Sequence, residues 1–318
     1  MGGEPRLTPS SGRAPSRRNV YCPRGRGMPQ YLKYDYDSLD DFWNAISPIG
    51  EIFGNSTGHY VFRGHRDSSW ELVPQVYRQD VINKYKTGMA ATLHDHPGQT
   101  FFEWMLLESF MHHCDLRGLS VPFDSMDFRE YFSLQNIMNM NSINNRLWPQ
   151  DRVLPLMAMA QHHGVPTRLL DWSSNPMVAC YFAAAGAVNE PTIPMNKRIA
   201  VFGFGFEPRR KDAEYRYVSV PGSTSVNISA QGGAFILVNN SGERGEIFTV
   251  GAKLEDKLIH DDRLVKLTLP ICLAGQLLLR CHKFGVSAAS IFPGYDGVAK
   301  AVLERNLAES FLERLVAG

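Results

Sequence analysis

Three short stretches of the sequence contain residues whose types suit chemistry better than simple packing. In the first, Phe62-Arg63-Gly64-His65 ends an apolar run that predicts a strand from His59 to Gly64. The guanidinium fork of arginine matches phosphate oxygens, and a neighbouring glycine lets a ligand approach the backbone closely. This pattern predicts a phosphate-binding role for Arg63, and a structural ion pair with an acid is the alternative.

The second stretch, residues 161–173, reads QHHGVPTRLLDWS and places polar groups between segments that are expected to be buried. Adjacent histidines, His162 and His163, suggest a metal, but neighbouring helical residues point about 100° apart and cannot both ligate one ion well. The HExxH spacing is absent as well. We therefore expect no metal, and the histidines either form hydrogen bonds in the core or line a substrate site. Asp171 either pairs with Arg168 or acts on a substrate.

The third stretch, residues 227–235, reads NISAQGGAF. Its two glycines permit a ligand to approach the backbone, and Asn227 and Gln231 place polar side chains just before a predicted strand. A simple turn leading into that strand is the alternative interpretation.

The spacing of apolar residues predicts the elements that must position these stretches. Predicted helices cover residues 34–49, 101–113, 152–162, 175–185, a segment around Leu277, and 296–316. Residues 124–145 are predicted to form a helix followed by a loop. Predicted strands cover residues 59–64, 199–206, 234–238, 264–269 and 289–292. Asn175 is the expected cap of the helix that begins at Pro176. The pattern indicates one α+β unit over residues 31–318, without internal repeats.

Composition and charge are those of an ordinary folded protein. The chain has 318 residues, of which 44% are hydrophobic and 20% charged, with a formal net charge of +1. No run approaches the roughly 20 apolar residues of a membrane helix, and the N-terminus lacks a secretory signal, so we expect a cytoplasmic protein without a membrane partner. The five cysteines are odd in number and form no CxxC pair, which fits a reducing compartment.

Residues 1–30 differ from the remainder of the chain. They contain six arginines against one glutamate, together with five prolines. This composition predicts a disordered basic tail. The tail is either only solvated or an arm that neutralises phosphates of a nucleic acid.

In this order, the three stretches resemble the FRG domain family, which is named for a Phe-Arg-Gly motif. The motif here is Phe62-Arg63-Gly64, with a family-like continuation at Ser69-Trp70, Leu72, Pro74 and Arg78. The family's longest signature is matched by AQHHGVPTRLLDWSSNPMVACYFA at 160–183, and shorter matches are QGGAF at 231–235, IFPG at 291–294 and Asp296-Gly297. The resemblance covers residues 35–305.

A weaker similarity is to ADP-ribosyltransferases of the Arg-Ser-Glu type. Arg63-Gly64 is similar to their NAD-holding strand. Residues 171–174 and 179–183 are similar to their Ser-Thr-Ser strand and the helix that follows it. Residues 231–238 lie where their glutamate strand is expected. This similarity implies an ADP-ribosyltransferase-like mixed or antiparallel β core with N-terminal and inserted helices.

Together, the resemblances imply an NAD-dependent mono-ADP-ribosyltransferase that modifies a nucleic-acid base, first of all cytosine in single-stranded DNA. NAD is then the co-substrate, held through its diphosphate by Arg63, with Trp172 or Tyr181 stacked on nicotinamide. The implied catalytic residues are Gln231, Asp171 and His163. The implied NAD-binding residues are Arg63, Gly64, His65, Thr167, Arg168, Trp172, Ser173 and Tyr181. His162 and Asn227 are the implied contacts to nucleic acid.

The sequence departs from the transferase pattern at one point. No Glu-x-Glu or Gln-x-Glu precedes Phe235, so the catalytic group is left open among Gln231, Asp171, and Glu243 or Glu246. A non-catalytic module that binds a nucleotide or a partner in the same pocket is therefore the alternative. Paired metal-binding carboxylates are absent from these motifs, which argues against a nuclease.

Overall fold

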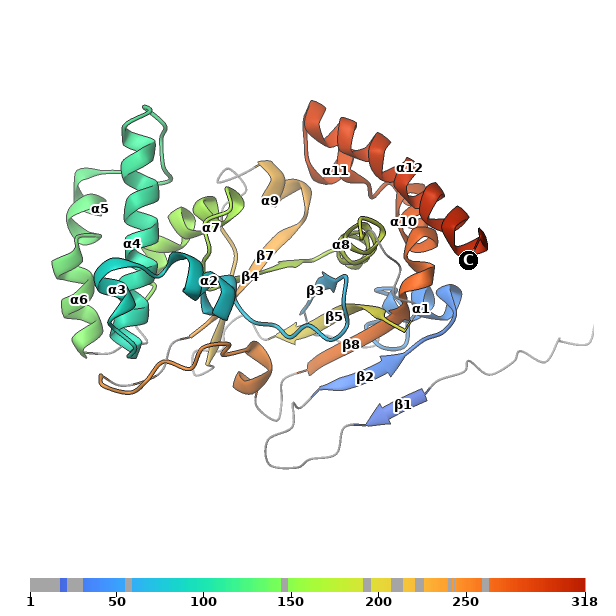
Figure 1. The fold of residues 1–318 in the computed structure, drawn as a ribbon, viewed down its shortest axis with the longest axis horizontal. Coiled ribbons are helices and arrows are strands. Elements are labelled where there is room, and N and C mark those ends of the chain that lie inside the picture. The colour runs from blue at the N-terminus through green and yellow to red at the C-terminus, as the bar shows by residue number, and fades with distance from the viewer. Residues whose placement is uncertain are drawn as a thin grey trace, which may run out of the picture.

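The structure is a computed structural model and describes residues 18–21, 31–54, 59–143, 148–190, 196–206, 214–220, 226–239, 242, 244–258 and 263–317. It is a mixed helix and sheet structure (Figure 1). The strands are β1 Arg18–Tyr21, β2 Leu32–Asp35, β3 His59–His65, β4 Leu169–Ser173, β5 Arg198–Phe206, β6 Tyr215–Val218, β7 Gly233–Val238 and β8 Arg263–Pro270. They form one sheet in the order β1-β2-β8-β5-β3-β4-β7-β6.

The strand pairs in this sheet are antiparallel except β2 with β8, which are parallel. The helices are α1 Leu39–Ile46, α2 Gln79–Tyr85, α3 Gly88–Ala91, α4 His96–Asp115, α5 Met126–Tyr131, α6 Leu134–Ile143, α7 Leu154–His162, α8 Pro176–Val188, α9 Val226–Ala230, α10 Ala274–Lys283, α11 Ala288–Ile291 and α12 Tyr295–Ala317. In the sequence, helices α2 to α7 all lie between strands β3 and β4.

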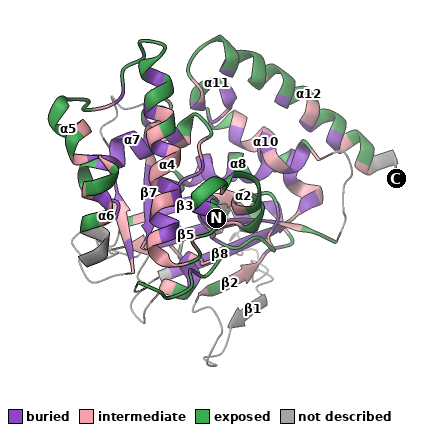
Figure 2. Ribbon diagram, turned by 60° about the vertical axis from the view of Figure 1, so that its left-hand side comes forward, coloured by how far each residue is buried: buried purple, intermediate pink, exposed green. Residues whose placement is uncertain are grey.

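Side chains alternate between the two faces of the sheet, as the pleat requires. On β5, Ile199 and Val201 pack under α1, α8, α10 and α12, whereas Phe202 and Phe204 pack on the opposite face. A third cluster joins Leu169 of β4 and the neighbouring strand β7 to helices α4–α7. Figure 2 accordingly colours most of the central strands, among them β5 and β7, as buried.

Two groups of helices share one face of the sheet. Phe62 of β3 pairs with Ser173 of β4, and Leu169 lies four residues earlier on β4, so all three point to the same face. Phe62 belongs to the cluster under α8, and Leu169 belongs to the cluster under α4–α7. The boundary between the two groups, visible in Figure 1 between α7 and α8, therefore lies above strands β3 and β4.

Several predicted elements are confirmed. Helix α8 begins as expected at Pro176, and the Asn175 side chain accepts a hydrogen bond from the amide of Met177 at 2.9 Å. The predicted strands at 59–64, 199–206, 234–238 and 264–269 correspond to β3, β5, β7 and β8. The last helix is α12, within two residues of the predicted bounds.

Other predictions differ from the structure. The segment 289–292, predicted as a strand, lies in helix α11, because Ser287 and Ser290 form a reciprocal capping box. The predicted helix at 34–49 is shorter: residues 32–35 form β2, and Ser38 caps α1. The segment 124–145, predicted as one helix followed by a loop, contains two helices, α5 and α6. Strands β2, β4 and β6 were not predicted as strands from apolar alternation.

Strand β1 lies inside the segment 1–30 that was predicted to be disordered, and it pairs with β2. The structure differs from that expectation at these four residues, and the other residues of the segment lie outside the described ranges. Within the described ranges, no helix combines the length and the apolar character that crossing a membrane requires.

Candidate functional site

The sheet opens between β3 and β4. Strand β3 pairs with β5 over all seven residues, from His59 to His65, but it pairs with β4 only at Phe62 and Ser173. Strand β4 stays paired with β7 over five residues. The two strands therefore part after Phe62, and backbone groups that face the gap need other partners. Arg63 supplies one, because its Nη1 donates a hydrogen bond to the backbone oxygen of Asp171 at 2.6 Å.

A cavity of about 640 Å³ lies at this opening. Such a volume is in the range of small-molecule and cofactor sites. Its wall comes from β3, the connection after β3, α7, β4, α8, α9, β7 and the residue that follows α11. The polar and aromatic residues that line it include Arg63, His65, Arg66, Trp70, Gln75, Arg78, Gln161, His162, Asp171, Trp172, Ser173, Phe182, Gln231 and Phe292.

The lining of the cavity carries an excess of positive charge. It contains Arg63, Arg66 and Arg78, and Asp171 is the one carboxylate among the described residues that line it. Arg66 is paired with Glu190 at 3.0 Å, and Arg78 donates from Nε to the backbone oxygen of Val73 at 3.2 Å. Arginine side chains in a concave site favour an anionic ligand, above all one with phosphate groups.

Arg63 is held on two sides. Its Nε donates to Nε2 of His65 at 3.0 Å, and its Nη1 lies 3.7 Å from Oδ2 of Asp171 as well as bonding to the backbone of that residue. Burial lowers the pKa of Arg63, and the charge of Asp171 opposes this change. A guanidinium fixed in this way is preorganised for a ligand, because little side-chain entropy remains to be lost on binding.

His65 is a neutral partner of Arg63. It is 6% exposed, and burial together with the charge of Arg63 lowers its pKa to about 3. Since its Nε2 accepts the hydrogen bond from Arg63, the ring proton of neutral His65 resides on Nδ1. The residue predicted to bind the cofactor thus lines the cavity and also orients Arg63.

Asp171 is oriented from the other side by Gln161. The Nε2 of Gln161 donates to Oδ1 of Asp171 at 2.5 Å, and the Oε1 of Gln161 accepts a hydrogen bond from the hydroxyl of Thr167. Thr167, predicted to bind the cofactor, is 2% exposed and lies outside the cavity lining, so it acts through Gln161. Gln161 belongs to the candidate stretch 161–173, but no role was predicted for it; the signal was an amide at the last turn of an otherwise apolar helix.

Gly64 is needed for a different reason from the one that the sequence suggested. A β carbon at this position would lie 1.9 Å from the backbone oxygen of Ala179 and 2.8 Å from the amide of Ala183. The absent side chain therefore lets helix α8 pack directly on strand β3. The close approach that glycine permits here is that of a helix, although Gly64 also lines the cavity.

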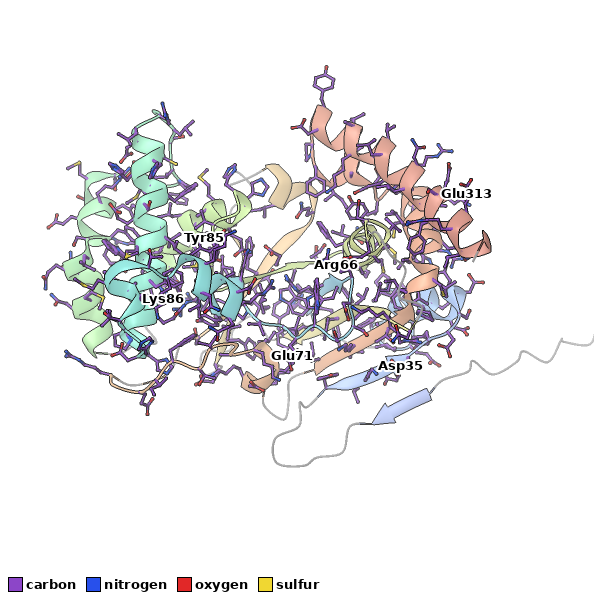
Figure 3. All side chains as sticks on the ribbon, viewed as in Figure 1. Asp35, Arg66, Glu71, Tyr85, Lys86 and Glu313 are labelled. Atoms are coloured by element: carbon purple, nitrogen blue, oxygen red, sulfur yellow. The ribbon has the colours of Figure 1, made fainter. Side chains whose placement is uncertain are left out.

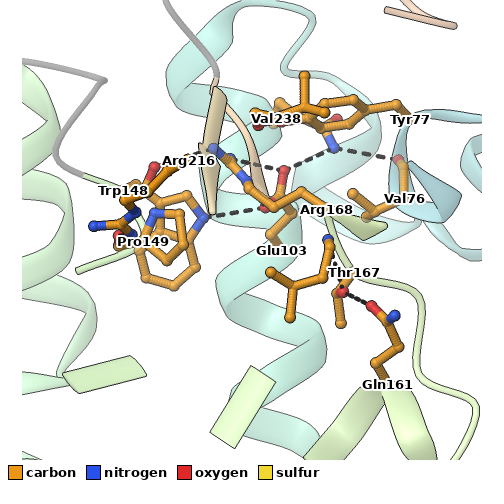
Figure 4. A network of polar contacts seen from close by, with 12 residues as sticks. Val76, Tyr77, Glu103, Trp148, Pro149, Gln161, Thr167, Arg168, Arg216 and Val238 are labelled. Carbon is orange, nitrogen blue, oxygen red and sulfur yellow. Dashed lines mark hydrogen bonds and ion pairs between the residues drawn. The ribbon is translucent and has the colours of Figure 1, made fainter. Parts of the chain in front are cut away.

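Arg168 was predicted to bind the cofactor, but it lies in the core (Figure 4). It is 0% exposed, and its Nε and Nη2 donate to the carboxylate of Glu103 at 2.6 and 2.9 Å. Its Nη1 donates to the backbone oxygen of Trp148 at 3.0 Å. The alternative pairing with Asp171 does not occur among these contacts. Arg168 therefore joins α4 to the start of β4 instead of contacting a ligand.

Tyr181 also lies in the core. Its side chain is 0% exposed, and its hydroxyl donates to Glu304 of α12 with oxygen–oxygen distances of 2.7 and 2.9 Å. It does not line the cavity, so it cannot stack on a ligand there. Its neighbour Phe182 does line the cavity and packs edge-to-face against Phe292, with ring centroids 6.2 Å apart. The aromatic ring that α8 contributes to the cavity is therefore that of Phe182, one residue after the predicted Tyr181.

The two adjacent histidines have different positions. His162 lines the cavity, and burial together with the charge of His163 lowers its pKa. His163 lies outside the lining and stacks on Phe110, with ring centroids 6.4 Å apart. Of the two, His162 is therefore the one placed to act on a ligand, although His163 was the predicted catalytic residue.

Trp172 and Ser173, predicted to bind NAD, and Gln231, predicted to be catalytic, all line the cavity. Trp172 is only 3% exposed and packs against Phe204, so most of its ring belongs to the core. The Ser173 hydroxyl donates to the backbone oxygen of Gln231 at 2.6 Å, and this bond ties β4 to the turn before β7. The side-chain Nε2 of Gln231 lies 3.5 Å from the backbone oxygen of Ile291.

Of the two glutamates considered as catalytic groups, the structure describes only Glu246. Glu246 is exposed and is not part of the lining, and Glu243 lies outside the described residues. Asn227 belongs to α9, and its side chain lies outside the described part of the chain. In the portion of the chain that the structure describes, no group of three or more histidine, cysteine, aspartate or glutamate side chains could hold a metal ion.

Comparison with known proteins yields one match. Residues 58–191 match the family model of the FRG domain. This range contains β3, β4, α7 and α8, and with them most of the residues that line the cavity. No curated protein and no solved structure matches the chain.

Proposed function

This chain carries an FRG domain at residues 58–191, and we propose that it is an NAD-dependent mono-ADP-ribosyltransferase acting on a base of single-stranded nucleic acid. We propose cytosine in DNA as the first acceptor and an ADP-ribosyltransferase-like origin for the sheet. The observation that carries the proposal is the pairing of Arg63 with Asp171 across the opening between β3 and β4. It places a phosphate-binding group and a carboxylate in contact within one cavity.

The arginines fit the diphosphate of NAD. Arg63 and Arg78 both line the cavity, and no hydrogen bond occupies the Nη2 of Arg63 among the described residues. A planar guanidinium binds phosphate oxygens in a bidentate manner. Holding the diphosphate would fix the rest of the dinucleotide relative to Asp171, which is the positioning that accounts for much of the catalysis in group transfer.

The reaction breaks one bond and forms one. The bond between ribose C1′ and the nicotinamide nitrogen breaks, and its electron pair leaves with neutral nicotinamide. A nitrogen of the acceptor base forms the new bond to C1′ and loses one proton. Positive charge develops on the ribose in the transition state, and the carboxylate of Asp171, oriented by Gln161, stabilises it.

His162 is the proposed acceptor of that proton. It lines the cavity, and its lowered pKa keeps it neutral near pH 7, so the ring can accept a proton. In place of Tyr181, Phe182 supports the nicotinamide ring in this arrangement. Gln231 lies at the same wall and contributes an amide dipole.

The acceptor has to be an unpaired base. The edge of cytosine that carries its amino group is occupied by base pairing in a duplex, so an enzyme must use a single strand or flip the base out. The arginines of the segment 1–30 would help to retain the strand through its phosphates.

A specific observation favours a second candidate, a non-catalytic nucleotide-binding module. Among the described residues, no glutamate lines the cavity, and the one carboxylate there, that of Asp171, lies in contact range of Arg63. A site of this kind could hold a nucleotide without cleaving it. The two functions differ in whether NAD is consumed.

The test is incubation of the purified protein with NAD and four homopolymeric single-stranded DNA oligonucleotides, followed by intact-mass measurement. We expect one ADP-ribose on the cytosine oligonucleotide and none with Arg63→Ala. Arg129→Ala serves as the control, because Arg129 pairs with Asp115 and Asp124 outside the cavity. If NAD binds but no nucleic-acid or protein acceptor is modified and no nicotinamide is released, the module is the correct function.

A further inference from the structure

The cavity contains an exposed aromatic residue that the proposed reaction does not use. Trp70 lines the cavity and is 44% exposed, whereas Trp148 and Trp172 are almost completely buried. The guanidinium of Arg66 lies over its ring, 4.9 Å from the centroid. Arg66 forms an ion pair with Glu190 at 3.0 Å and packs against Gly186 of α8. Figure 3 shows Arg66 beside helix α8.

Trp70 stands at the end of a continuous row of side chains. Asp171 contacts Arg63, and Arg63 bonds to His65 at 3.0 Å. The His65 ring meets the Trp70 ring edge-on, with centroids 6.1 Å apart. Each of these residues, with Arg66, lines the same cavity. The row therefore leads from a carboxylate through a guanidinium to an exposed indole backed by a second guanidinium.

We propose that Trp70 and Arg66 form a subsite for the purine base of a nucleotide whose phosphates bind Arg63 and Arg78. An indole offers a stacking surface to any base, and a guanidinium over it adds a second planar group. The charge of Arg66 is already neutralised by Glu190, so Arg66 is better suited to stack on the base than to bind a phosphate. This inference rests on the proposed function, because it orients NAD with its adenine at Trp70 and its reactive ribose at Asp171.

The experiment measures the two halves of the dinucleotide separately. Adenosine monophosphate and nicotinamide mononucleotide are titrated by calorimetry into the full chain, its Trp70→Leu variant and a Tyr85→Leu control. Tyr85 is a matched residue, because it is 42% exposed and lies under Lys84 at 5.0 Å but does not line the cavity. Thermal unfolding of each variant checks that the fold is retained.

We expect Trp70→Leu to lower the affinity for adenosine monophosphate by ten-fold or more. The affinity for nicotinamide mononucleotide should stay within two-fold of its value in the unaltered chain. The Tyr85→Leu control should change neither affinity. Equal weakening of both halves, no effect on adenosine monophosphate, or no binding of adenosine monophosphate to the unaltered chain would each overturn the subsite.

The outcome is separable from that of the proposed function. If adenosine monophosphate binding depends on Trp70 but NAD is never consumed, the subsite is supported and the transferase function is refuted. If ADP-ribose is transferred but adenosine monophosphate binding does not depend on Trp70, the transferase function is supported and the subsite is refuted.

Discussion

Arg63 and Asp171 are joined twice: Nη1 of the arginine donates to the backbone oxygen of the aspartate at 2.6 Å and lies 3.7 Å from its carboxylate oxygen Oδ2. The first contact replaces a strand-to-strand hydrogen bond where β3 and β4 part. The second brings opposite charges together at the cavity wall. Under the proposed function, a phosphate that binds Arg63 would compete with the Asp171 carboxylate for the same cation.

Asp171→Asn should separate binding from chemistry. The amide oxygen can still accept the hydrogen bond from Gln161, but the negative charge that would stabilise the cationic transition state of the proposed reaction is lost. We expect the transfer rate to fall by about 100-fold or more, while NAD binds as well as or better than before. Asp37→Asn is the control, since Asp37 pairs with Arg198 outside the cavity. A variant that retains its rate would show that Gln231 or another group performs this role.

The sequence predicted the cavity-lining segments well because each one is local. The Phe-Arg-Gly motif, the run 161–173 and the turn at Gln231 all contribute to the cavity. Long-range partners could not be predicted from spacing: Arg168 is paired with Glu103, 65 residues away, and Tyr181 with Glu304, 123 residues away. A polar residue that looks free for a ligand in the sequence can be satisfied by a distant acid in the fold.

The same limit applies to the secondary structure. Helices α7 and α8 could be predicted because local signals mark them: each has a proline in its first turn, and Asn175 caps α8. Strand β4 has buried residues on both faces and one exposed carboxylate, Asp171, so it shows no simple alternation. Its identity as a strand depends on pairing with β7, more than 60 residues later.

Gly64→Ala tests whether this glycine serves packing or ligand binding. The new methyl group would overlap the backbone oxygen of Ala179, and backbone atoms of a buried helix cannot move aside easily. We expect a loss of about 3 kcal/mol or more in the free energy of unfolding, measured in urea. Gly186→Ala is the matched control: the three atoms nearest to its β carbon would be side-chain atoms of Arg66, the closest being the Cβ at 3.0 Å, so a change within about 1 kcal/mol is expected. Unchanged stability of Gly64→Ala would refute the packing explanation.

The buried pair of Arg168 and Glu103 predicts a non-additive response. Arg168→Met leaves an uncompensated carboxylate in the core and should destabilise the protein by about 3–5 kcal/mol. Adding Glu103→Gln removes that charge and keeps an acceptor for Trp148, so the double variant should recover at least about 1 kcal/mol. Arg129→Met, at an exposed pair, should cost less than about 1 kcal/mol. Strictly additive losses would contradict the assignment of Arg168 to the core.

His65 should make stability depend on pH. Its native pKa is lowered to about 3 from 6.5, so the unfolded chain binds a proton below pH 6.5 while the native state does not. The stabilisation is fully present above pH 6.5 and is lost as pH falls toward 3. The loss in the free energy of unfolding amounts to about 2 kcal/mol between pH 6.5 and pH 5.

Urea unfolding at a series of pH values should show this loss in the unaltered protein and a smaller loss in His65→Gln, whose amide oxygen can still accept a hydrogen bond from Arg63. His59→Gln, an exposed position on the same strand, is the control and should retain the full dependence. If His65→Gln also retained it, the pKa of His65 would not be lowered by folding, and its role as a neutral acceptor for Arg63 below pH 6.5 would be wrong.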